Sequence, residues 1–410
     1  MLNKDGIREL AYVARVEEIR PLDGYDRVEY ARIGAGWWLI VPKGQFKVGD
    51  LGVYFEPDSR VPQEEPFLFL EKRNYKIKAM KMCKVVSQGL LMHFDDFGWQ
   101  ANKYQEGTFL TKELKVTYAD DEDNIRKANT GDKYRSMQDR HKKIFKTKWA
   151  KWLMKREWGR KLMFMFFGKK KDKRGWPAWV SKTDEERVQN MGWLFPTCTT
   201  KWIATEKIDG TSTTFTMRND RKKQLLVCSR NVVYDTPAKA DRNFYKDTDG
   251  NVYLEMAAKY NMETVLRDMI AAFEKSGSTT GEVFKVSPQW GKLQYITIQG
   301  ETYGGTVQKR DYGLEHRLKV FNIIFGYENN KFRLNPIDGK TVAEAFGLDY
   351  VPVVAEDITL PSTCDEVVAM AHGKSEVDGK EREGLVFRSY DGTQSFKAVD
   401  PEFLIKYHSN

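Results

Sequence analysis

Cysteine is scarce in this chain of 410 residues. The four cysteines lie far apart, form no Cys-x-x-Cys pair and have no histidine at ligand-like spacing: Cys83, Cys198, Cys228 and Cys364. This pattern supports neither a zinc site nor a disulfide framework. We therefore expect the cysteines to be buried or free thiols.

Long apolar runs are also missing. No stretch of about 18 apolar residues occurs, so the sequence predicts no membrane-spanning helix. Residues 1–5 lack the apolar core of a signal peptide, and we expect an intracellular protein. None of the five histidines falls in a motif described below, so catalysis by a histidine base is not favoured.

The composition and the charge distribution describe a folded protein with one very basic stretch. A hydrophobic share of 41% and a charged share of 30% suit two folded domains. The net charge is +9. Residues 126–174 alone hold nineteen Lys or Arg and four Asp or Glu, a local charge of +15, so the remainder carries −6. We expect any polyanionic partner to bind this stretch.

The first quarter of the chain predicts short β-strands. Segments rich in Val, Ile, Tyr and Trp alternate with glycine-containing turns, at 10–19, 27–33, 37–41 and 51–55. Strands at this spacing suggest a small barrel or sandwich, although any small β domain would fit. For Trp37 and Trp38 we favour packing in the core, because adjacent strand residues face opposite sides and at most one of the two would face outward.

Strand alternation stops in residues 112–180. Between 142 and 161, lysines and arginines interleave with tryptophans and aliphatic residues at helical spacing, giving one basic and one apolar face. Three interpretations stay open: a solvated helix packed on the barrel, a phosphate-binding surface, or a helix lying on an anionic membrane. Next, residues 183–186 (Thr-Asp-Glu-Glu) predict a helix N-terminus with a capping box.

A candidate nucleophile follows. Residues 202–205 predict a strand that runs into Glu206 and Lys207, and Asp209-Gly210 predicts a tight turn that would let a phosphate approach closely. A protonated lysine is a poor nucleophile, so nearby cations or a dry pocket must lower the pKa of Lys207. By itself, Lys-x-Asp-Gly is a weak pattern.

Other chemistry-bearing residues follow in order along predicted strands. They are Arg230 at a strand end, Glu301 after an apolar strand, Phe321 in a buried strand, Glu383 before a strand, and Lys397 within the last strand. Each has an ordinary explanation when taken alone: core packing for Phe321, a surface ion pair for Arg230, an exposed strand position for Lys397. Their occurrence together and in order favours a single site.

This ordered set resembles the six motifs of the covalent nucleotidyltransferases, the superfamily of polynucleotide ligases and RNA capping enzymes, over residues 182–406. Near the N-terminus, residues 25–29, 43–50, 54–59 and 87–91 resemble the OB domain of one group of RNA ligases. With both of these features, the chain resembles the ATP-dependent RNA ligases with an N-terminal OB domain, known from Deinococcus and Naegleria.

The resemblance implies an α+β fold: an OB-like β-barrel, then an adenylyltransferase domain of antiparallel sheets with flanking helices. We expect an OB-like domain over 1–111, a basic helical insertion over 112–180 and a nucleotidyltransferase domain over 181–410, in a monomer. The expected partner is RNA or an RNA-containing nicked duplex, gripped by the OB domain, and segment 126–174 is a candidate for further contact.

The resemblance also assigns roles. Lys207 would form the phosphoramidate to AMP, with Glu206 beside the adenine and Phe321 stacked on it. Arg230 would touch a phosphate or the 3′ end, and Lys397 would contact the α-phosphate and help lower the pKa of Lys207. Glu301 would reach the ribose or a metal-bound water, and Glu383 would support Mg²⁺ or Mn²⁺.

Two other functions stay open. DNA ligases and capping enzymes share the motifs but usually place an OB domain after the last one, and only residues 406–410 follow Ile405 here. A non-catalytic binding protein with a decayed ligase domain would have lost a motif residue, and none is lost. The expected activity is ATP-dependent sealing of 3′-OH/5′-phosphate breaks, with nicks bearing an RNA 3′-OH as the implied substrate.

Overall fold

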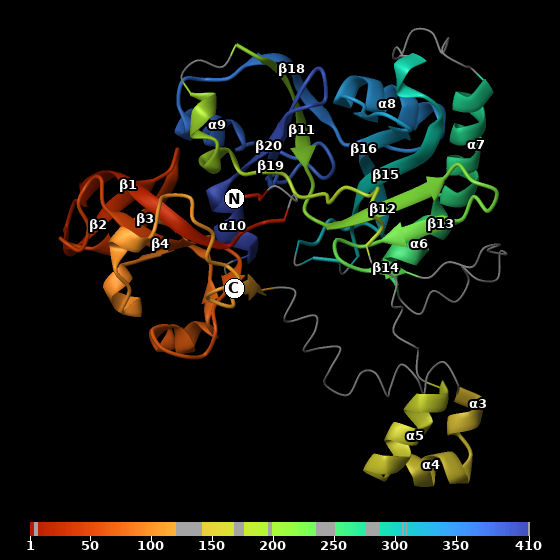
Figure 1. The fold of residues 1–410 in the computed structure, drawn as a ribbon, viewed down its shortest axis with the longest axis horizontal. Coiled ribbons are helices and arrows are strands. Elements are labelled where there is room, and N and C mark those ends of the chain that lie inside the picture. Colours follow the sequence, from red (N-terminus) through yellow and green to blue (C-terminus); the bar gives the residue numbers. More distant parts are fainter. Residues whose placement is uncertain are drawn as a thin grey trace.

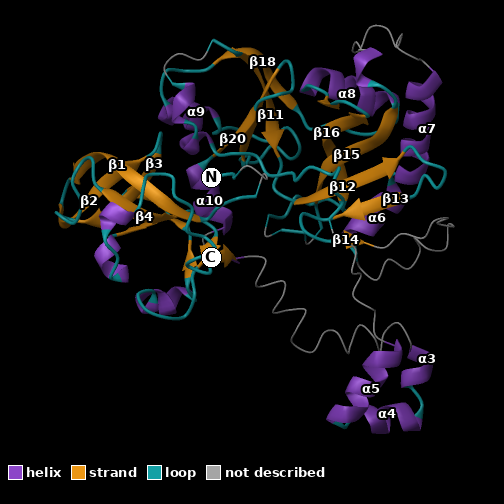
Figure 2. Ribbon diagram, viewed as in Figure 1, coloured by secondary structure: helices purple, strands orange, loops and turns teal. Residues whose placement is uncertain are grey.

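The computed structural model describes the whole chain except residues 4–6, 120–141, 168–175, 196–198, 235–250, 276–287, 306, 309 and 409–410. Two β-rich domains lie next to each other, and a group of three short helices is drawn apart from them (Figure 1). Strands and helices are both abundant in the larger domain (Figure 2). The predicted α+β class is confirmed.

The first domain is built on a five-stranded antiparallel sheet with the order β3-β2-β1-β4-β9. Its strands are β1 (Ala11–Leu22), β2 (Tyr25–Ile33), β3 (Trp37–Pro42), β4 (Leu51–Phe55) and β9 (Leu90–Met92). Smaller sheets are formed by β5 (Ser59–Arg60), β6 (Lys76–Ile77) and β10 (Thr117–Tyr118), and by β7 (Ala79–Met82) with β8 (Val85–Gln88). The four strands predicted between 10 and 55 are confirmed.

Strand β3 joins the first domain to the second. Trp37 and Trp38 are both buried, so the expected core packing is confirmed for both rings. The Trp37 indole N–H donates to Asn190 Oδ1 at 2.6 Å, and the Trp38 indole N–H lies 3.1 Å from both carboxylate oxygens of Asp365. Neither ring is therefore available for stacking on a base.

The segment after residue 111 adds to the first domain. Strand β10 pairs with β5, and Val116 lies in the same apolar cluster as Leu10 and Phe55. We propose a division of the chain in which the first domain extends to about residue 119, the helical segment follows, and the second domain spans 181–410. Residues 120–141 and 168–175 of the predicted insertion lie outside the described residues.

The second domain contains two antiparallel sheets. One has the order β18-β11-β19-β20, with β11 (Lys201–Lys207), β18 (Val353–Thr359), β19 (Gly384–Ser389) and β20 (Ser395–Val399). The other has the order β14-β13-β12-β15-β16-β17, with β12 (Thr211–Arg218), β13 (Leu225–Cys228), β14 (Val233–Tyr234), β15 (Leu293–Tyr303), β16 (Arg317–Tyr327) and β17 (Lys331–Arg333). The chain passes from one sheet to the other directly after Lys207, at the turn before β12.

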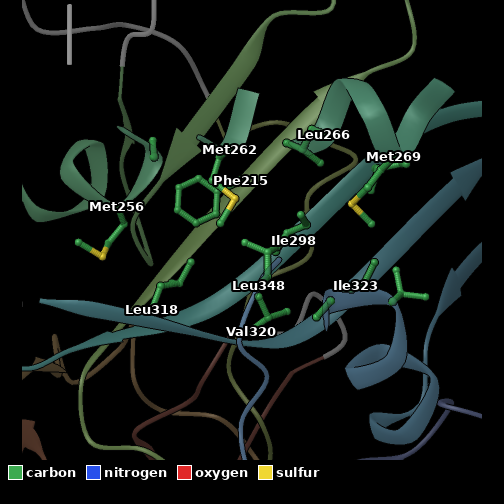
Figure 3. Close-up of a cluster of buried hydrophobic side chains, with 14 of the residues drawn as sticks. Phe215, Met256, Met262, Leu266, Met269, Ile298, Leu318, Val320, Ile323 and Leu348 are labelled. Atoms are coloured by element: carbon green, nitrogen blue, oxygen red, sulfur yellow. The ribbon is translucent and has the colours of Figure 1, made fainter. Parts of the chain in front are cut away.

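Helices α6 (Val252–Lys259) and α7 (Met262–Lys275) pack on the six-stranded sheet. Leu266 and Met269 of α7 meet Phe215 and Ile298 of the sheet in one apolar cluster (Figure 3). The sequence predicts a single helix over 253–274, but the structure breaks it at Asn261, whose φ of 51° is left-handed. The remaining helices of this domain are α8 (Pro336–Ala345), α9 (Cys364–Met370) and α10 (Pro401–His408).

The basic segment forms α3 (Lys142–Phe145), α4 (Lys148–Met154) and α5 (Glu157–Phe167), which confirms the predicted helical spacing. These helices pack around their own small cluster of Phe145, Ala150 and Met163. Among the described helices of the whole chain, none has the length and hydropathy needed to cross a membrane.

Candidate active site

Residues from both sheets of the second domain line a cavity of about 750 Å³. All of the site residues predicted from the sequence are among them: Glu206, Lys207, Arg230, Glu301, Phe321, Glu383 and Lys397. Lys207 and Lys397 come from the four-stranded sheet, and Glu383 directly precedes it. Residues far apart in the chain thus converge because the two sheets meet at this point.

Lys207 is the last residue of β11, and the pairing of β11 with β19 sets its neighbour. Lys207 pairs in register with Gly384, which brings the preceding residue, Glu383, within reach of the lysine side chain. The Nζ atom donates to Glu383 Oε2 at 2.7 Å. An added β-carbon at Gly384 would collide with the Ala398 carbonyl, so glycine allows β19 and β20 to approach here.

The charge state of Lys207 differs from the expected one. Burial alone lowers the pKa of Lys207, but the carboxylates of Glu383 and Glu301 outweigh it and raise this pKa above the ordinary lysine value. The expectation of a lowered pKa is therefore wrong for this state of the protein. The nearest charged groups are anions, so the amine is held protonated.

Glu301 lies in β15, opposite Ser212 of β12 and Lys319 of β16. Burial raises its pKa to about 8, and the nearby charge of Glu383 adds to this effect while Lys207 opposes it. Among the described residues, no group of three His, Cys, Asp or Glu side chains is arranged to hold a metal.

Two carboxylates, Glu301 and Glu383, nevertheless lie near Lys207 in the same cavity. Carboxylate oxygens are preferred ligands of Mg²⁺ and Mn²⁺, and Mg²⁺ often keeps several waters and takes only one or two carboxylates. The pKa of Glu301 is raised chiefly because the side chain is buried, and a divalent cation bound here would favour the ionised carboxylate. The donor set therefore fits a hydrated divalent cation.

Lys397 lies in the middle of β20 and is buried, so the exposed strand position considered above is excluded. Its Nζ donates to Asp184 Oδ1 at 3.0 Å. Burial lowers the pKa of Lys397 to about 8, with help from Arg8, Arg187 and Lys207, while Asp184 opposes the shift. Of the two cavity lysines, Lys397 is the one with the depressed pKa.

Residues 183–186 form no helix, so the predicted capping box is wrong. The segment is extended and runs alongside β20, where the Lys397 amide donates to the Glu186 carbonyl at 2.7 Å. Asp184 forms ion pairs with both Lys397 and Arg230. Although burial opposes ionisation, these two cations hold the pKa of Asp184 well below its ordinary value. The tertiary position of the segment, rather than its local pattern, decides its structure.

The adjacent Glu185 holds a second pair of cations. It accepts from Arg388 at 3.0 Å, and Arg333 lies 3.5 Å away. Sequence reasoning missed both acidic residues as parts of the site.

Glu206 and Phe321 sit on neighbouring walls of the cavity. The Glu206 carboxylate accepts from the Ser375 hydroxyl and from the Glu376 amide at 2.8 Å, and burial raises its pKa. Phe321 packs against the cluster of apolar residues in the six-stranded sheet while also facing the cavity. Core packing and ring contact with a ligand are therefore compatible for Phe321.

The first domain also supplies cavity walls, which the sequence did not indicate. Arg8, Asp58 and Tyr118 line the cavity together with Lys207. The Arg230 guanidinium lies 4.3 Å from the centre of the Tyr118 ring, within the range of a cation–π contact. Arg230 is thus held between the two domains, where it is half-buried and also pairs with Asp184.

The fold and the cavity define a two-domain protein with an OB-type sheet and a lysine-centred site between antiparallel sheets. Residues 200–408, just over half of the chain, match the RNA ligase family, and residues 10–94 match an OB-fold domain. The chain belongs to the RNA ligase family.

Solved structures of similar fold are known from Naegleria gruberi. The chain is 22% identical to the RNA ligase of that organism with PPi, with a TM-score of 0.67, covering 98% of this chain and 100% of that one. Mutants of that ligase with AMP and Mn and with ATP and Mn are 23% and 24% identical, with TM-scores of 0.66 and 0.67. Their coverage is 98% of this chain in both cases, and 100% and 98% of the ligase chains. No curated protein sequence matches the chain.

Proposed function

We propose that this RNA ligase is ATP-dependent and joins 3′-OH and 5′-phosphate ends through AMP bound covalently to Lys207. The observation that carries the proposal is the meeting of Lys207, Glu383, Glu301 and Lys397 in one buried cavity. The similar structures from Naegleria gruberi with ATP, AMP, PPi and Mn support ATP and a divalent cation as the nucleotide and metal.

In the first step, the Lys207 amine attacks the α-phosphate of ATP. A nitrogen–phosphorus bond forms, the bond to the bridging oxygen breaks, and pyrophosphate leaves with that electron pair. The lysine gives up one proton before the attack and a second as the new bond forms. Glu383, which already accepts the Lys207 hydrogen bond, is the nearest proton acceptor. In the structure this carboxylate favours the ammonium, so the amine must be freed when the substrate binds.

The other cavity residues hold the nucleotide. Lys397 and Arg230, now paired with Asp184, supply positive charge for the phosphates. Phe321 stacks on the adenine, and Glu206 lies beside it. Glu301 and Glu383 would hold Mg²⁺ or Mn²⁺ directly or through water, and such an ion would neutralise charge on the leaving pyrophosphate.

Two further steps seal the strand. An oxygen of the RNA 5′-phosphate attacks the bound AMP, the nitrogen–phosphorus bond breaks, and Lys207 recovers its protons. The 3′-OH then attacks the activated 5′-phosphate, gives up its proton, and displaces AMP. One polypeptide supplies every named group, so we propose that the monomer is the active form.

Labelling tests the first step. The protein is incubated with α-³²P-ATP or GTP, or with ³²P-labelled NAD, and a divalent cation, then run on a denaturing gel. We expect label from ATP in the wild type and none in Lys207→Ala. Lys201→Ala is the matched control, because Lys201 begins the same strand but is exposed. Label that persists in a folded Lys207→Ala protein would exclude Lys207, and label from GTP alone would indicate a capping-type enzyme.

Substrate preference needs a separate test. We propose that the preferred substrate is a nick with an RNA 3′-OH, and we expect faster sealing of such a nick than of one with a DNA 3′-OH. Two nicked duplexes that differ only in the sugar of the 3′-terminal strand would be compared at equal concentration. Equal sealing rates would refute the preference while leaving the labelling result intact.

A further inference from the structure

Three tryptophans are exposed on the group of helices α3 to α5. The exposed fractions are 52% for Trp149, 50% for Trp152 and 53% for Trp158. Tryptophan is highly buried on average, and adjacent exposed apolar groups mark interaction surfaces. The small cluster of Phe145, Ala150 and Met163 already holds the helices together, so these rings are not needed as its core.

Cations share the same face as the rings. Lys148 and Lys151 of α4, with Lys155 at its C-terminal cap, recur at helical spacing beside Trp149 and Trp152, and all five side chains are exposed. The buried Ala150 faces the opposite way. The α4 arc therefore presents aromatic and cationic groups side by side, so the expectation of one basic and one apolar face is wrong for this helix.

The ring arrangement extends to the next helix. The Arg156 guanidinium lies 3.9 Å from the centre of the Trp152 ring, and Trp152 meets Trp158 edge to face at 6.1 Å between ring centres. These contacts hold the rings in fixed orientations without burying them. Two of the three tryptophans thus form an ordered, solvent-exposed edge-to-face pair.

The positive charge of this surface is nearly uncompensated within the helices. Glu157 is the only acidic residue between 142 and 167, and it pairs with Lys161 at 2.9 Å. No acidic residue of these helices is left for Lys148, Lys151 or Lys155. A polyanion with flat apolar groups would satisfy both the charges and the rings.

We propose that the exposed face of α4, with Arg156 and Trp158, binds an RNA strand outside the break, with phosphates on the lysines and bases on the tryptophans. This inference rests on the proposed function, because it supplies that reaction with substrate contacts remote from Lys207. Base stacking on aromatic side chains is independent of sequence, and phosphate contacts make binding sensitive to salt.

An anionic membrane is the competing partner, since basic helices with tryptophan also lie on lipid. Membrane-surface helices separate a polar face from an apolar face, whereas rings and lysines on α4 share one arc. Helix α4 is also only seven residues long, which gives about 10 Å of helix for insertion. Both observations favour RNA.

Binding is measured by the fluorescence anisotropy of a fluorescein-labelled nicked RNA duplex and of a labelled single strand. All variants carry Lys207→Ala, so that no sealing occurs. We expect the triple variant Lys148→Gln, Lys151→Gln, Lys155→Gln to raise the Kd about tenfold at 0.1 M salt and to reduce the slope of log K against log salt by about 2. Trp149→Ala should raise the Kd about fivefold or more.

The matched control is Lys222→Gln, Lys292→Gln, Lys340→Gln, three exposed lysines of the second domain. It should leave the Kd within about twofold, since surface charges remote from the contact change affinity little. Circular dichroism checks that the helices persist. Unchanged affinity and salt slope in the α4 triple variant, or an equal loss in the control, would overturn the proposal.

Two additional measurements separate the possible failures. In the first, the wild type and the α4 variants are tested for binding to phosphatidylcholine/phosphatidylserine vesicles. If the variants lose vesicle binding but keep RNA binding, the partner is a membrane and the proposal is overturned. Labelling with α-³²P-ATP, in proteins that retain Lys207, should be the same with and without the α4 substitutions. Absence of label in the wild type would refute the proposed function, while loss of RNA binding in the α4 variant would still support this surface.

Discussion

The cationic side chains of the cavity and those of helix α4 are in opposite situations. In the cavity, Lys207 is paired with Glu383, and Lys397 with Asp184. On α4, Lys148, Lys151 and Lys155 are exposed and have no acidic residue available within their helices. The same residue type therefore occurs in two environments, one enclosed and paired with carboxylates and the other exposed to solvent.

The physical reason is the cost of removing a charge from water. A buried ammonium without a partner is expensive, so each cavity lysine must be accompanied by a carboxylate until a substrate replaces it. An exposed lysine is solvated and needs no partner. The cavity thus holds its charges in prearranged pairs, whereas α4 leaves them available for a polyanion.

Breaking a buried pair should have the largest effect on stability. In Asp184→Asn, Lys397 and Arg230 lose their shared carboxylate, and we expect the free energy of unfolding to fall by about 3 kcal/mol. Denaturant unfolding measures this change. The control is Glu64→Gln, whose exposed pair with Lys115 at 3.1 Å should contribute less than about 1 kcal/mol. Equal effects at the two sites would mean that burial does not distinguish these pairs.

An intermediate effect should depend on pH. The pKa of Glu301 rises from an ordinary 4.5 to about 8 on folding, so the folded state binds more protons than the unfolded state between these values. The contribution of Glu301 to the free energy of unfolding is therefore largest below about pH 4.5 and is lost as the pH rises toward 8.

The variant Glu301→Gln removes this pH dependence. The unfolding free energy of the variant minus that of the wild type should increase by more than about 1 kcal/mol when the pH is raised from 5.5 to 7.5. Denaturant unfolding at a series of pH values gives the difference. Glu315→Gln, at a carboxylate that is 92% exposed, should show no such trend. A constant difference between wild type and Glu301→Gln would contradict the raised pKa.

The smallest effect on stability should come from α4. Lys151→Gln removes one exposed charge, and we expect the unfolding free energy to change by less than about 0.5 kcal/mol. RNA affinity should nevertheless decrease, since a phosphate contact is lost. Thermal unfolding measures the change in stability, and fluorescence anisotropy on the same preparation measures the change in RNA affinity. A loss of more than about 1 kcal/mol would mean that Lys151 has a structural partner.

Much of the fold followed from local patterns. The strands of the first domain were predicted because alternating apolar residues between glycine turns leave few alternatives, and β1 to β4 appear at those positions. The helical segment around Trp152 was predicted from its spacing. The break at Asn261 was not, because the apolar spacing continues through it, although asparagine adopts the left-handed conformation more readily than most residues.

The site was predictable in part. The pattern around Lys207 and the later motif residues identified one set of cavity residues, all of which converge. Asp184 and Tyr118 were missed, since their importance comes from partners 213 residues away in the first case and in the other domain in the second. The segment 183–186 also looked like a helix start, and local capping preferences were overridden by ion pairs with distant cations.

The sequence by itself identified the side chains that meet in the cavity, because residue type and order along the chain are enough to indicate strand ends and helical faces. Only the tertiary structure decided their charge states. Lys207 has a raised pKa and Lys397 a lowered one because carboxylates, cations and buried surface from several elements surround each amine differently. Such surroundings depend on distances in space, which no spacing along the chain specifies.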